Sequence, residues 1–394
     1  MMSLPTKLDY PAAGFGAPKN RRGHARDARA GIGLPPGTEV FSADNHLSVA
    51  TDIFYEQFPD DLKDEAPRIW YEDGAYMVGV KGKSFVVGDF SAVLMQYDDL
   101  AGAATGAAEI DTRIAELAED GVDKELAFPN AVLALFHYPD KALRERIFRI
   151  YNEYIADIQE RSNGHFYGVG LINWWEPAGT RRTLDELKAL GIKTFLMPLY
   201  PGFDDDGVVI DYGSTAMIPV WDAIEEAGLP VTHHIGETPP KSPCEVGSVA
   251  VAMMINIDSF RDMFARYIFS GILDRHPSLR VGWFEGGIAW VPSALQDGEH
   301  VLASYRHMLD HPPRHDIRYY WDTHMSASFM VDPLGLSLID QIGVDKVMWS
   351  SDYPHNESTF GYSEQSLAAV VAALGPQDAA RVVSGNIKRF LGVS

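Results

Sequence analysis

An aspartate and a histidine stand two residues apart in the segment Ser42-Ala43-Asp44-Asn45-His46. Side chains two positions apart on a β-strand point to the same side, so on a strand Asp44 and His46 would face one point. A carboxylate oxygen and an imidazole nitrogen together suit Zn²⁺, Mn²⁺ or Fe²⁺. The other explanation for so short a motif is an Asx turn at a strand exit.

A second source of metal-type side chains is the adjacent pair His233 and His234 in the segment PVTHHIGE. Neighbouring residues of a strand point to opposite faces, so only one of the two can face the same point as Asp44. We select His234, because it lies nearer the end of the apolar run and Gly236 lets the backbone turn away. His233 is expected to be buried and bonded to the backbone.

A third segment, VMWSSDYPH, delivers Asp352 at the end of an apolar run. A carboxylate buried there is costly unless it is paired or bound to a metal. A role as a turn or helix-capping aspartate before Pro354 is the alternative. His355 follows closely and could orient a substrate or a metal-binding carboxylate.

Glu285 ends another apolar run, in the segment RVGWFEGG. Desolvation raises the pKa of a carboxyl group and a nearby metal lowers it, so Glu285 could serve as a base near neutral pH. It could equally be a further metal ligand. The purely structural explanation is a salt bridge to Arg280 or another basic residue.

The elements that must position these residues are short β-branched or aromatic runs that alternate with longer amphipathic stretches, the pattern of repeated βα units. Catalytic groups of a (β/α)8 barrel collect at the carboxyl ends of its strands, which is where the four segments above place them. We therefore predict an α/β fold, a TIM barrel. An open doubly wound sheet is the alternative, but the G-x-G-x-x-G motif of its nucleotide-binding form is missing after the first strand. The eight predicted strands are Glu39 to His46, Glu125 to Asn130, Phe166 to Asn173, Lys193 to Leu199, Pro230 to Gly236, Arg280 to Gly287, Trp321 to Ser328 and Lys346 to Tyr353.

The chain divides into an N-terminal arm and one catalytic domain. Residues 1–37 are rich in Gly, Pro, Ala and Arg without sustained periodicity, which is typical of an extended arm. Residues 38–394 form the predicted barrel domain. Within it, residues from about 50 to 111 carry aromatics and glycines with little helical period, so we expect an insertion after the first strand that covers one end of the barrel.

Composition narrows the class of partner. A formal charge of −22 over 394 residues repels phosphate backbones and anionic lipid, which argues against nucleic-acid or membrane binding. The longest apolar run, Val249 to Ile255, is far shorter than the roughly 20 residues needed to cross a bilayer. The single cysteine, Cys244, allows no intrachain disulfide. We expect a cytoplasmic enzyme with a small-molecule substrate, and an ordered arm would favour a homo-oligomer, a dimer.

Taken together, the motifs resemble a known enzyme family. They are D-x-H, H-x-G, R-H-P-x-L-R-V-x-x-x-E-G-G-I-x-W, S-D-Y-P-H and a closing G-N-x-x-R, and they span residues from about 39 to 391. This combination resembles the amidohydrolase-related family, in the branch of aminocarboxymuconate semialdehyde decarboxylase and the resorcylate-type decarboxylases. The resemblance implies one divalent metal ion, bound by Asp44, His46, His234 and Asp352. We expect Zn²⁺, with Mn²⁺ or Fe²⁺ as alternatives.

This chain departs from that pattern at two residues. Asp44 replaces a histidine or glutamate and keeps a ligand, whereas Glu285 replaces the catalytic histidine of the decarboxylase relatives. We therefore expect a metal-dependent hydrolase in which activated water attacks a carbonyl-type substrate, aromatic or cyclic compounds included. A non-oxidative decarboxylase of an aromatic or unsaturated acid is the alternative, and a non-catalytic barrel with a binding role is a remote third.

Six residues complete the predicted active site. Glu285, Asp352 and His355 are the expected catalytic groups. The aromatic side chains that lie at or just past strand exits could form walls for the substrate, although core packing explains them nearly as well. They are Trp174, Trp290 and Tyr353.

Overall fold

The computed structural model describes most of the chain from residue 31 onward. The N-terminal arm up to residue 30, residues 85–108 of the predicted insertion and Cys244 lie outside the described residues. The described ranges are 31–50, 52–72, 75–80, 83–84, 109–204, 206–236, 251, 254–355 and 358–394.

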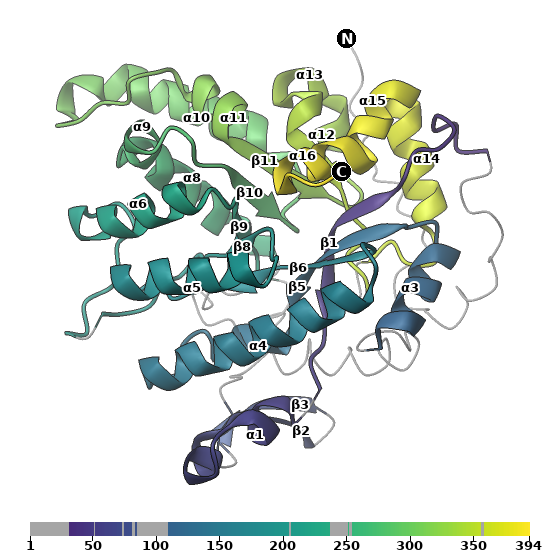
Figure 1. Ribbon diagram of the computed structural model, residues 1–394. Coiled ribbons are helices and arrows are strands. Elements are labelled where there is room, and N and C mark those ends of the chain that lie inside the picture. The colour runs from purple at the N-terminus through teal and green to yellow at the C-terminus, as the bar shows by residue number, and fades with distance from the viewer. Residues whose placement is uncertain are drawn as a thin grey trace.

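Parallel strands form the centre of the molecule (Figure 1). They fall into two sheets, with strand orders β1-β5-β6 and β7-β8-β9-β10-β11-β12. Their side chains are almost entirely buried, as expected of a parallel sheet covered by helices. The bounds are β1 Phe41–Leu47, β5 Lys124–Pro129, β6 Phe166–Gly168, β7 Gly170–Leu171, β8 Phe195–Leu196, β9 Val231–His234, β10 Val281–Phe284, β11 Met325–Phe329 and β12 Val347–Trp349.

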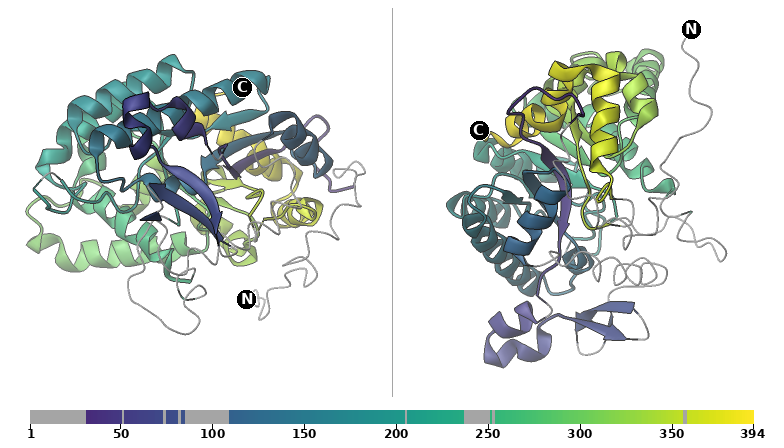
Figure 2. Two further views of the ribbon diagram at one scale, coloured as in Figure 1. Left: turned by 90° about the horizontal axis from the view of Figure 1, so that it is seen from below. Right: turned by 90° about the vertical axis from the view of Figure 1, so that its right-hand side faces the viewer.

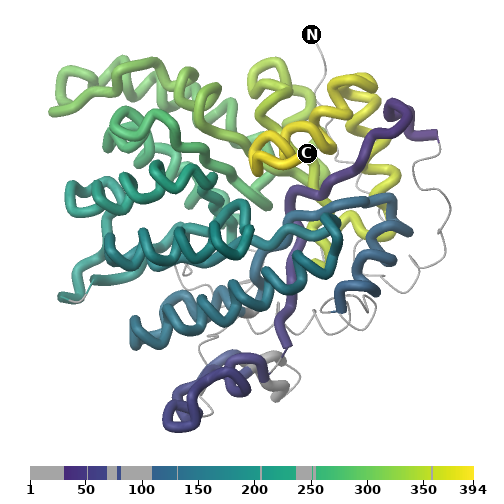
Figure 3. The backbone as a smooth tube through the Cα atoms, in the orientation of Figure 1, coloured from purple at the N-terminus to yellow at the C-terminus, as the bar shows by residue number. Residues whose placement is uncertain are grey.

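Backbone hydrogen bonds link the two sheets at both junctions. Only Val169 separates β6 from β7, and its amide donates to the Ala127 carbonyl of β5 at 2.9 Å. At the other junction the Asp352 amide, just past β12, donates to the Asp44 carbonyl of β1 at 2.7 Å. Figure 3 shows β1 running between β5 and the C-terminal segment. With β6 and β7 counted as one interrupted strand, the strand order is that of a (β/α)8 barrel, and the predicted fold class is confirmed.

Helices cover the outside of the strands (Figure 1). The longest, α4, begins where the Asp140 side chain accepts the Leu143 amide at 2.9 Å, and it buries one apolar stripe that includes Ile147 and Ile155. None of the helices in the described ranges is both long enough and apolar enough to span a membrane. The main helices are α3 Ile110–Glu119, α4 Lys141–Arg161, α5 Pro177–Ala189, α6 Ile218–Ala227, α8 Asp258–Phe269, α9 Ile272–Arg275, α10 Trp290–Tyr305, α11 Ile317–His324, α12 Pro333–Ser337, α13 Ile339–Ile342, α14 Ser363–Leu374, α15 Pro376–Ala380 and α16 Asn386–Leu391.

The segment between β1 and α3 holds a small unit of its own. It comprises α1 Ile53–Gln57, the 3₁₀ turn Asp60–Glu65 and an antiparallel sheet of β2 Arg68–Glu72, β3 Ala75–Val80 and β4 Lys83–Ser84. Figure 2 shows the unit projecting past the carboxyl end of β1, apart from the ring of helices. The Tyr138 hydroxyl, in the segment that follows β5, donates to the Glu65 carbonyl at 2.8 Å and ties the unit to the carboxyl side of the barrel. A role in covering the pocket stays a prediction.

One predicted strand begins too early. The run Trp321 to Ser328 is helical in its first half, because α11 extends to His324 and β11 starts only at Met325. The helix begins where the Asp316 side chain accepts the Tyr319 amide at 2.7 Å. The aromatic residues of this helix suggested a strand, but the cap and the burial of Trp321 outweigh local strand propensity.

Candidate functional site

A β-bulge in β1 determines which of its side chains face the barrel interior. Ser42 pairs with Glu125 of β5, but Asn45 pairs with Ala127, so two β1 residues lie opposite one residue of β5. Ser42 and Asn45 therefore share one side, where the Ser42 hydroxyl donates to Asn45 Oδ1 at 2.9 Å. On the other side His46 Nε2 lies 3.7 Å from Asp44 Oδ1.

The two histidines at the end of β9 face opposite ways, as predicted. His234 Nε2 lies 3.4 Å from Asp44 Oδ1. Its Nδ1 is 2.6 Å from the Ile235 carbonyl oxygen, which can only accept, so Nδ1 carries the proton and Nε2 points to the site. His233 donates from Nδ1 to the Met197 carbonyl at 2.8 Å and accepts from the Tyr267 hydroxyl at 2.8 Å. Burial lowers the pKa of His233 to about 3, so its ring is neutral.

Asp352 and Glu285 follow β12 and β10 in left-handed backbone conformations, with φ of 59° and 68°. Such conformations are costly for residues other than glycine, and the surrounding structure must hold them. The Glu285 amide donates to the Ser328 hydroxyl of β11 at 3.1 Å, and the Asp352 amide is held by β1. His46 Nε2 lies 3.3 Å from Asp352 Oδ1 and 3.6 Å from Glu285 Oε2.

Close packing behind Glu285 requires the glycine that follows it. A Cβ on Gly286 would lie 2.4 Å from Cε2 of Phe260, a buried ring under β10. Gly286→Ala is therefore expected to lower the free energy of unfolding by about 1–3 kcal/mol, the usual cost of overpacking a core. Urea unfolding followed by circular dichroism would measure the change. Gly385→Ala is the matched control, because Gly385 has helical backbone angles and an added Cβ would lie no closer than 3.9 Å to Arg381 Cβ. Equal stability of wild type and Gly286→Ala would contradict the close packing of Gly286 against Phe260.

His355 completes the cluster. Its Nδ1 lies 3.1 Å from Asp352 Oδ1 and 3.8 Å from Glu285 Oε1. Its ring stacks on the ring of His46 with a centroid separation of 3.7 Å. Burial, reinforced by the neighbouring His46, holds the pKa of His355 well below its usual range, so the ring is neutral beside the carboxylates.

The chemistry of these groups fits a divalent metal ion. Ligand-type atoms of Asp44, His46 and His234 lie within 4.8 Å of one another, and so do those of His46, Glu285, Asp352 and His355. Within the described residues, both carboxylate oxygens of Asp44 and both ring nitrogens of His46 are buried without a hydrogen bond. Buried polar atoms left in this state normally have a partner, and a cation would provide one. Mixed oxygen and nitrogen ligands suit Zn²⁺, Mn²⁺ and Fe²⁺.

His234 and the buried carboxylates beside it shift one another's pKa. Burial raises the pKa of Asp44 and is only partly opposed by His234. Burial would also lower the pKa of His234, but the carboxylates of Asp44 and Glu285 raise it well above its usual range. Burial alone would raise the pKa of Glu285, yet the interactions with His234 and His46 hold it well below its usual range. Metal binding would therefore displace a proton from His234.

An aromatic floor lies beneath the cluster. The ring centroid of Phe128, in β5, is 4.6 Å from that of His234 and 5.0 Å from that of Phe284. Both phenylalanines are fully buried. Phe128 was missed by sequence reasoning, although its place near the end of a predicted strand was a usable signal.

The salt bridge between Glu285 and Arg280, considered above as a structural explanation for Glu285, is not what the structure shows. The Arg280 guanidinium instead donates to the Phe390 and Gly228 carbonyls.

The three predicted substrate-wall residues are buried and have satisfied polar atoms. Trp174 donates to the Pro201 carbonyl at 2.9 Å, and Trp290 donates to the Gly287 carbonyl at 3.1 Å. The Tyr353 hydroxyl donates to the Glu116 carboxylate. Packing therefore accounts for all three, and a contact with substrate stays a prediction.

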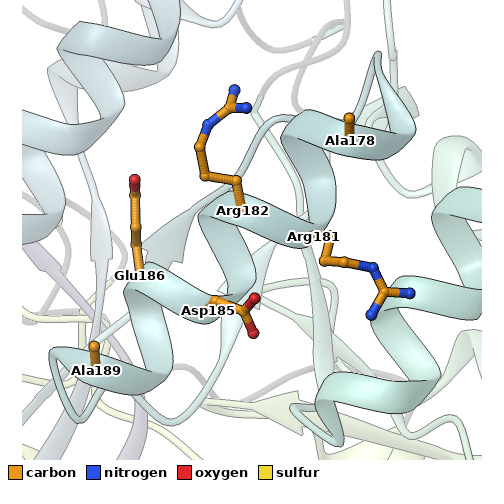
Figure 4. Close-up of a pocket in the computed structure, with 6 residues that line it drawn as sticks. All are labelled: Ala178, Arg181, Arg182, Asp185, Glu186 and Ala189. Atoms are coloured by element: carbon orange, nitrogen blue, oxygen red, sulfur yellow. The ribbon is translucent and has the colours of Figure 1, made fainter.

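Two surface hollows formed by described residues are lined by side chains outside the cluster. Figure 4 shows one on α5, lined by Arg181, Arg182 and Glu186 among others. Its arginines are already paired, Arg182 with Glu145 and Arg181 with Glu226. Because these arginines are already paired with carboxylates, we interpret this hollow as a solvated helix face.

Comparison with known proteins identifies the family. The family model described as amidohydrolase matches residues 45–393. The chain belongs to the amidohydrolase family. Among solved structures, an amidohydrolase from Mycobacterium avium subsp. paratuberculosis superposes with a TM-score of 0.73 at 17% identity, covering 91% of this chain and 100% of that one. The family resemblance inferred from the motifs is confirmed.

Other amidohydrolase-fold neighbours are decarboxylases. The 5-carboxyvanillate decarboxylase of Novosphingobium aromaticivorans, complexed with manganese and 4-hydroxy-3-methoxy-5-nitrobenzoic acid, has a TM-score of 0.70 at 14% identity and covers 92% of this chain and 99% of its own. The 2,6-dihydroxybenzoate decarboxylase from Rhizobium has a TM-score of 0.63 at 17% identity and covers 90% and 99%. At these identities the likeness is one of fold.

Proposed function

We propose that this amidohydrolase-family protein is a metal-dependent decarboxylase of a hydroxylated aromatic carboxylic acid. The observation that carries the proposal is the cluster of Asp44, His46, His234 and Asp352 at the carboxyl ends of strands in a fold shared with such decarboxylases. The decarboxylase alternative drawn from sequence thus receives more support than the hydrolase expectation.

Asp44, His46, His234 and Asp352 would hold the metal ion. When bound, the ion would supply positive charge to orient the substrate's carboxylate and ortho hydroxyl. Phe128 and Phe284 pack beneath the histidines and hold the His234 ring in place from inside the barrel. His355 stacks on His46 and lies against Asp352, so it would keep both in place while remaining uncharged itself.

Glu285 is the group proposed to move the proton. Its carboxylate is ionised near neutral pH, because His234 and His46 lower its pKa more than burial raises it. It would accept the proton of the ortho hydroxyl and deliver that proton to the ring carbon that bears the carboxylate. The carbon–carbon bond then breaks, CO₂ leaves with its electron pair returned to the ring, and the phenolate oxygen takes a proton from water. The net change is one carboxylate and one proton converted to CO₂ and an aromatic C–H bond.

A second candidate, hydrolysis of a carbonyl compound, is favoured by one feature. A carboxylate rather than the histidine implied by the decarboxylase resemblance ends β10, and Glu285 could equally accept a proton from an attacking water molecule. Both candidates use the same residue as proton acceptor, so products must separate them.

Product analysis tests the proposal. Protein stripped of metal and reloaded with Mn²⁺ or with Zn²⁺ is expected to release CO₂ from 2,6-dihydroxybenzoate or a related hydroxybenzoate, and metal-free protein is expected to release none. CO₂ can be followed by a coupled assay and the phenol by chromatography. Acid release from lactones or amides, without CO₂ from any hydroxybenzoate, would instead establish the hydrolase.

A further inference from the structure

A chain of buried polar side chains runs behind the metal cluster, on the side of β1 away from the donors. It begins with the ion pair of Arg113, in α3, and Glu125, in β5, whose Nε and Oε1 atoms are 2.6 Å apart. A second bond joins Arg113 Nη2 to Glu125 Oε2 at 2.8 Å. Both residues are fully buried. Asn45 Nδ2 then donates to the same Oε2 atom at 2.6 Å, so the chain passes from β5 to β1.

Asn45 occupies the position between the two β1 donors, Asp44 and His46. Strand alternation directs its side chain away from the donors, and the bulge brings Ser42 to the same side. Its Oδ1 accepts the backbone amide of Tyr353 at 2.9 Å. Ser42 Oγ accepts the backbone amide of Ser351 at 2.8 Å. Two β1 side chains thus hold the residues on either side of Asp352.

The backbone at Asp352 needs such support. Its φ of 59° is one that residues other than glycine rarely adopt, so contacts around it must maintain it. Helix α3 adds to the support, since the Arg113 guanidinium lies 4.9 Å from the ring centroid of Tyr353. The Glu116 carboxylate of the same helix accepts the Tyr353 hydroxyl.

Stability alone is a poor explanation for the buried ion pair. Removing two charges from water costs about as much as their attraction returns, and well-packed apolar side chains often serve at least as well. What the Arg113 and Glu125 pair provides is a fixed acceptor for Asn45 Nδ2, which orients the amide so that Oδ1 faces the Tyr353 amide. The same Oδ1 also accepts the Ser42 hydroxyl, and Ser42 Oγ in turn accepts the Ser351 amide.

We propose that Asn45, oriented by Glu125 and Arg113, is a positioning residue that sets the distance between Asp352 and the β1 donors Asp44 and His46. This inference rests on the proposed metal-dependent function of the cluster. Asn45 acts through the backbone and touches neither metal nor substrate. Its loss would let Asp352 drift from the geometry that the metal requires while the barrel itself remains folded.

The test is metal affinity, measured on the full chain without any substrate. Wild type is expected to bind one Mn²⁺ per chain in a titration followed by electron paramagnetic resonance. Asn45→Ala is expected to weaken that affinity by about 10- to 100-fold, the usual effect of losing a partner that orients a ligand. The visible spectrum of bound Co²⁺ should change as well, because it reports ligand geometry.

Asn152→Ala is the matched control. Asn152 is equally buried and makes two backbone hydrogen bonds to Leu171, both at 2.8 Å, on a strand that carries no donor of the cluster. It should lower thermal stability as Asn45→Ala does and leave Mn²⁺ affinity and the Co²⁺ spectrum unchanged. If Asn45→Ala does not fold, Ser42→Ala removes the neighbouring bond to Ser351 and is expected to weaken affinity in the same direction.

The outcomes distinguish failure of the Asn45 inference from failure of the proposed metal-dependent function. Wild-type affinity in folded Asn45→Ala would overturn the inference and leave the metal centre standing. An equal loss of affinity in Asn152→Ala would also overturn it, because the effect would then be one of general destabilisation. A wild-type protein that binds no divalent ion would overturn the proposed function itself, and the inference with it.

Discussion

His234→Ala is expected to leave the protein folded but unable to hold a divalent metal ion, with loss of all turnover. His234 Nε2 lies 3.4 Å from Asp44 Oδ1 and 2.9 Å from Glu285 Oε2, so it lies between a β1 donor and the proposed proton acceptor that follows β10. Losing a ligand should cost more than the roughly 10- to 100-fold in affinity lost with an outer partner. Metal content by mass spectrometry after dialysis, with circular dichroism as a check of folding, measures the result.

His233→Ala provides a matched control on the adjacent residue. His233 has the same chemistry but faces away, bonded to the Met197 carbonyl and the Tyr267 hydroxyl. Its loss leaves those groups unsatisfied and should cost about 1–3 kcal/mol of stability, with metal content retained. Full metal occupancy in His234→Ala would remove His234 from the centre. Metal loss in His233→Ala alone would reverse the assignment of the pair.

Glu285→Gln is expected to keep metal and substrate binding but to lower kcat by roughly 10² to 10⁴-fold, the typical cost of losing a general acid–base group. The substitution keeps the size of the side chain and removes only its ability to take up a proton. In the wild-type protein the Glu285 carboxylate lies 2.9 Å from His234 Nε2 and 3.6 Å from His46 Nε2, within reach of any molecule bound at the cluster. Steady-state kinetics at saturating Mn²⁺ would give kcat and KM separately.

Two other results would assign Glu285 differently. Weakened metal affinity with partial rescue by excess metal would make it a ligand. Unchanged kcat in a folded variant would place the proton acceptor elsewhere, with His355 next in line because its Nδ1 is 3.1 Å from Asp352. Glu225→Gln is a suitable control, since Glu225, in α6, accepts hydrogen bonds from the amide and hydroxyl of Ser278, and its loss should affect stability only.

Local pattern was enough to predict the barrel and the residues that gather at its carboxyl end. Strand and helix periods are properties of short segments, so the order of βα units could be read from the chain. The rule that strand ends share one face of a barrel then brought Asp44, His234, Glu285 and Asp352 together in the prediction. Prediction from local pattern fails at the segment from Trp321 to His324, where the structure has a capped helix and the aromatic residues suggested a strand.

Features that depend on contacts between distant segments were decided by the tertiary structure. The bulge that brings Ser42 to the same side as Asn45 exists only because β1 pairs with β5, and the strand period alone gives no sign of it. The left-handed backbone at Glu285 and Asp352 is likewise held by Ser328 and by β1, residues remote in sequence. The sequence therefore determined which side chains could bind a metal. Their spacing, and the buried chain from Arg113 to Asn45 behind them, arose from packing, because long-range contacts carry no local signature.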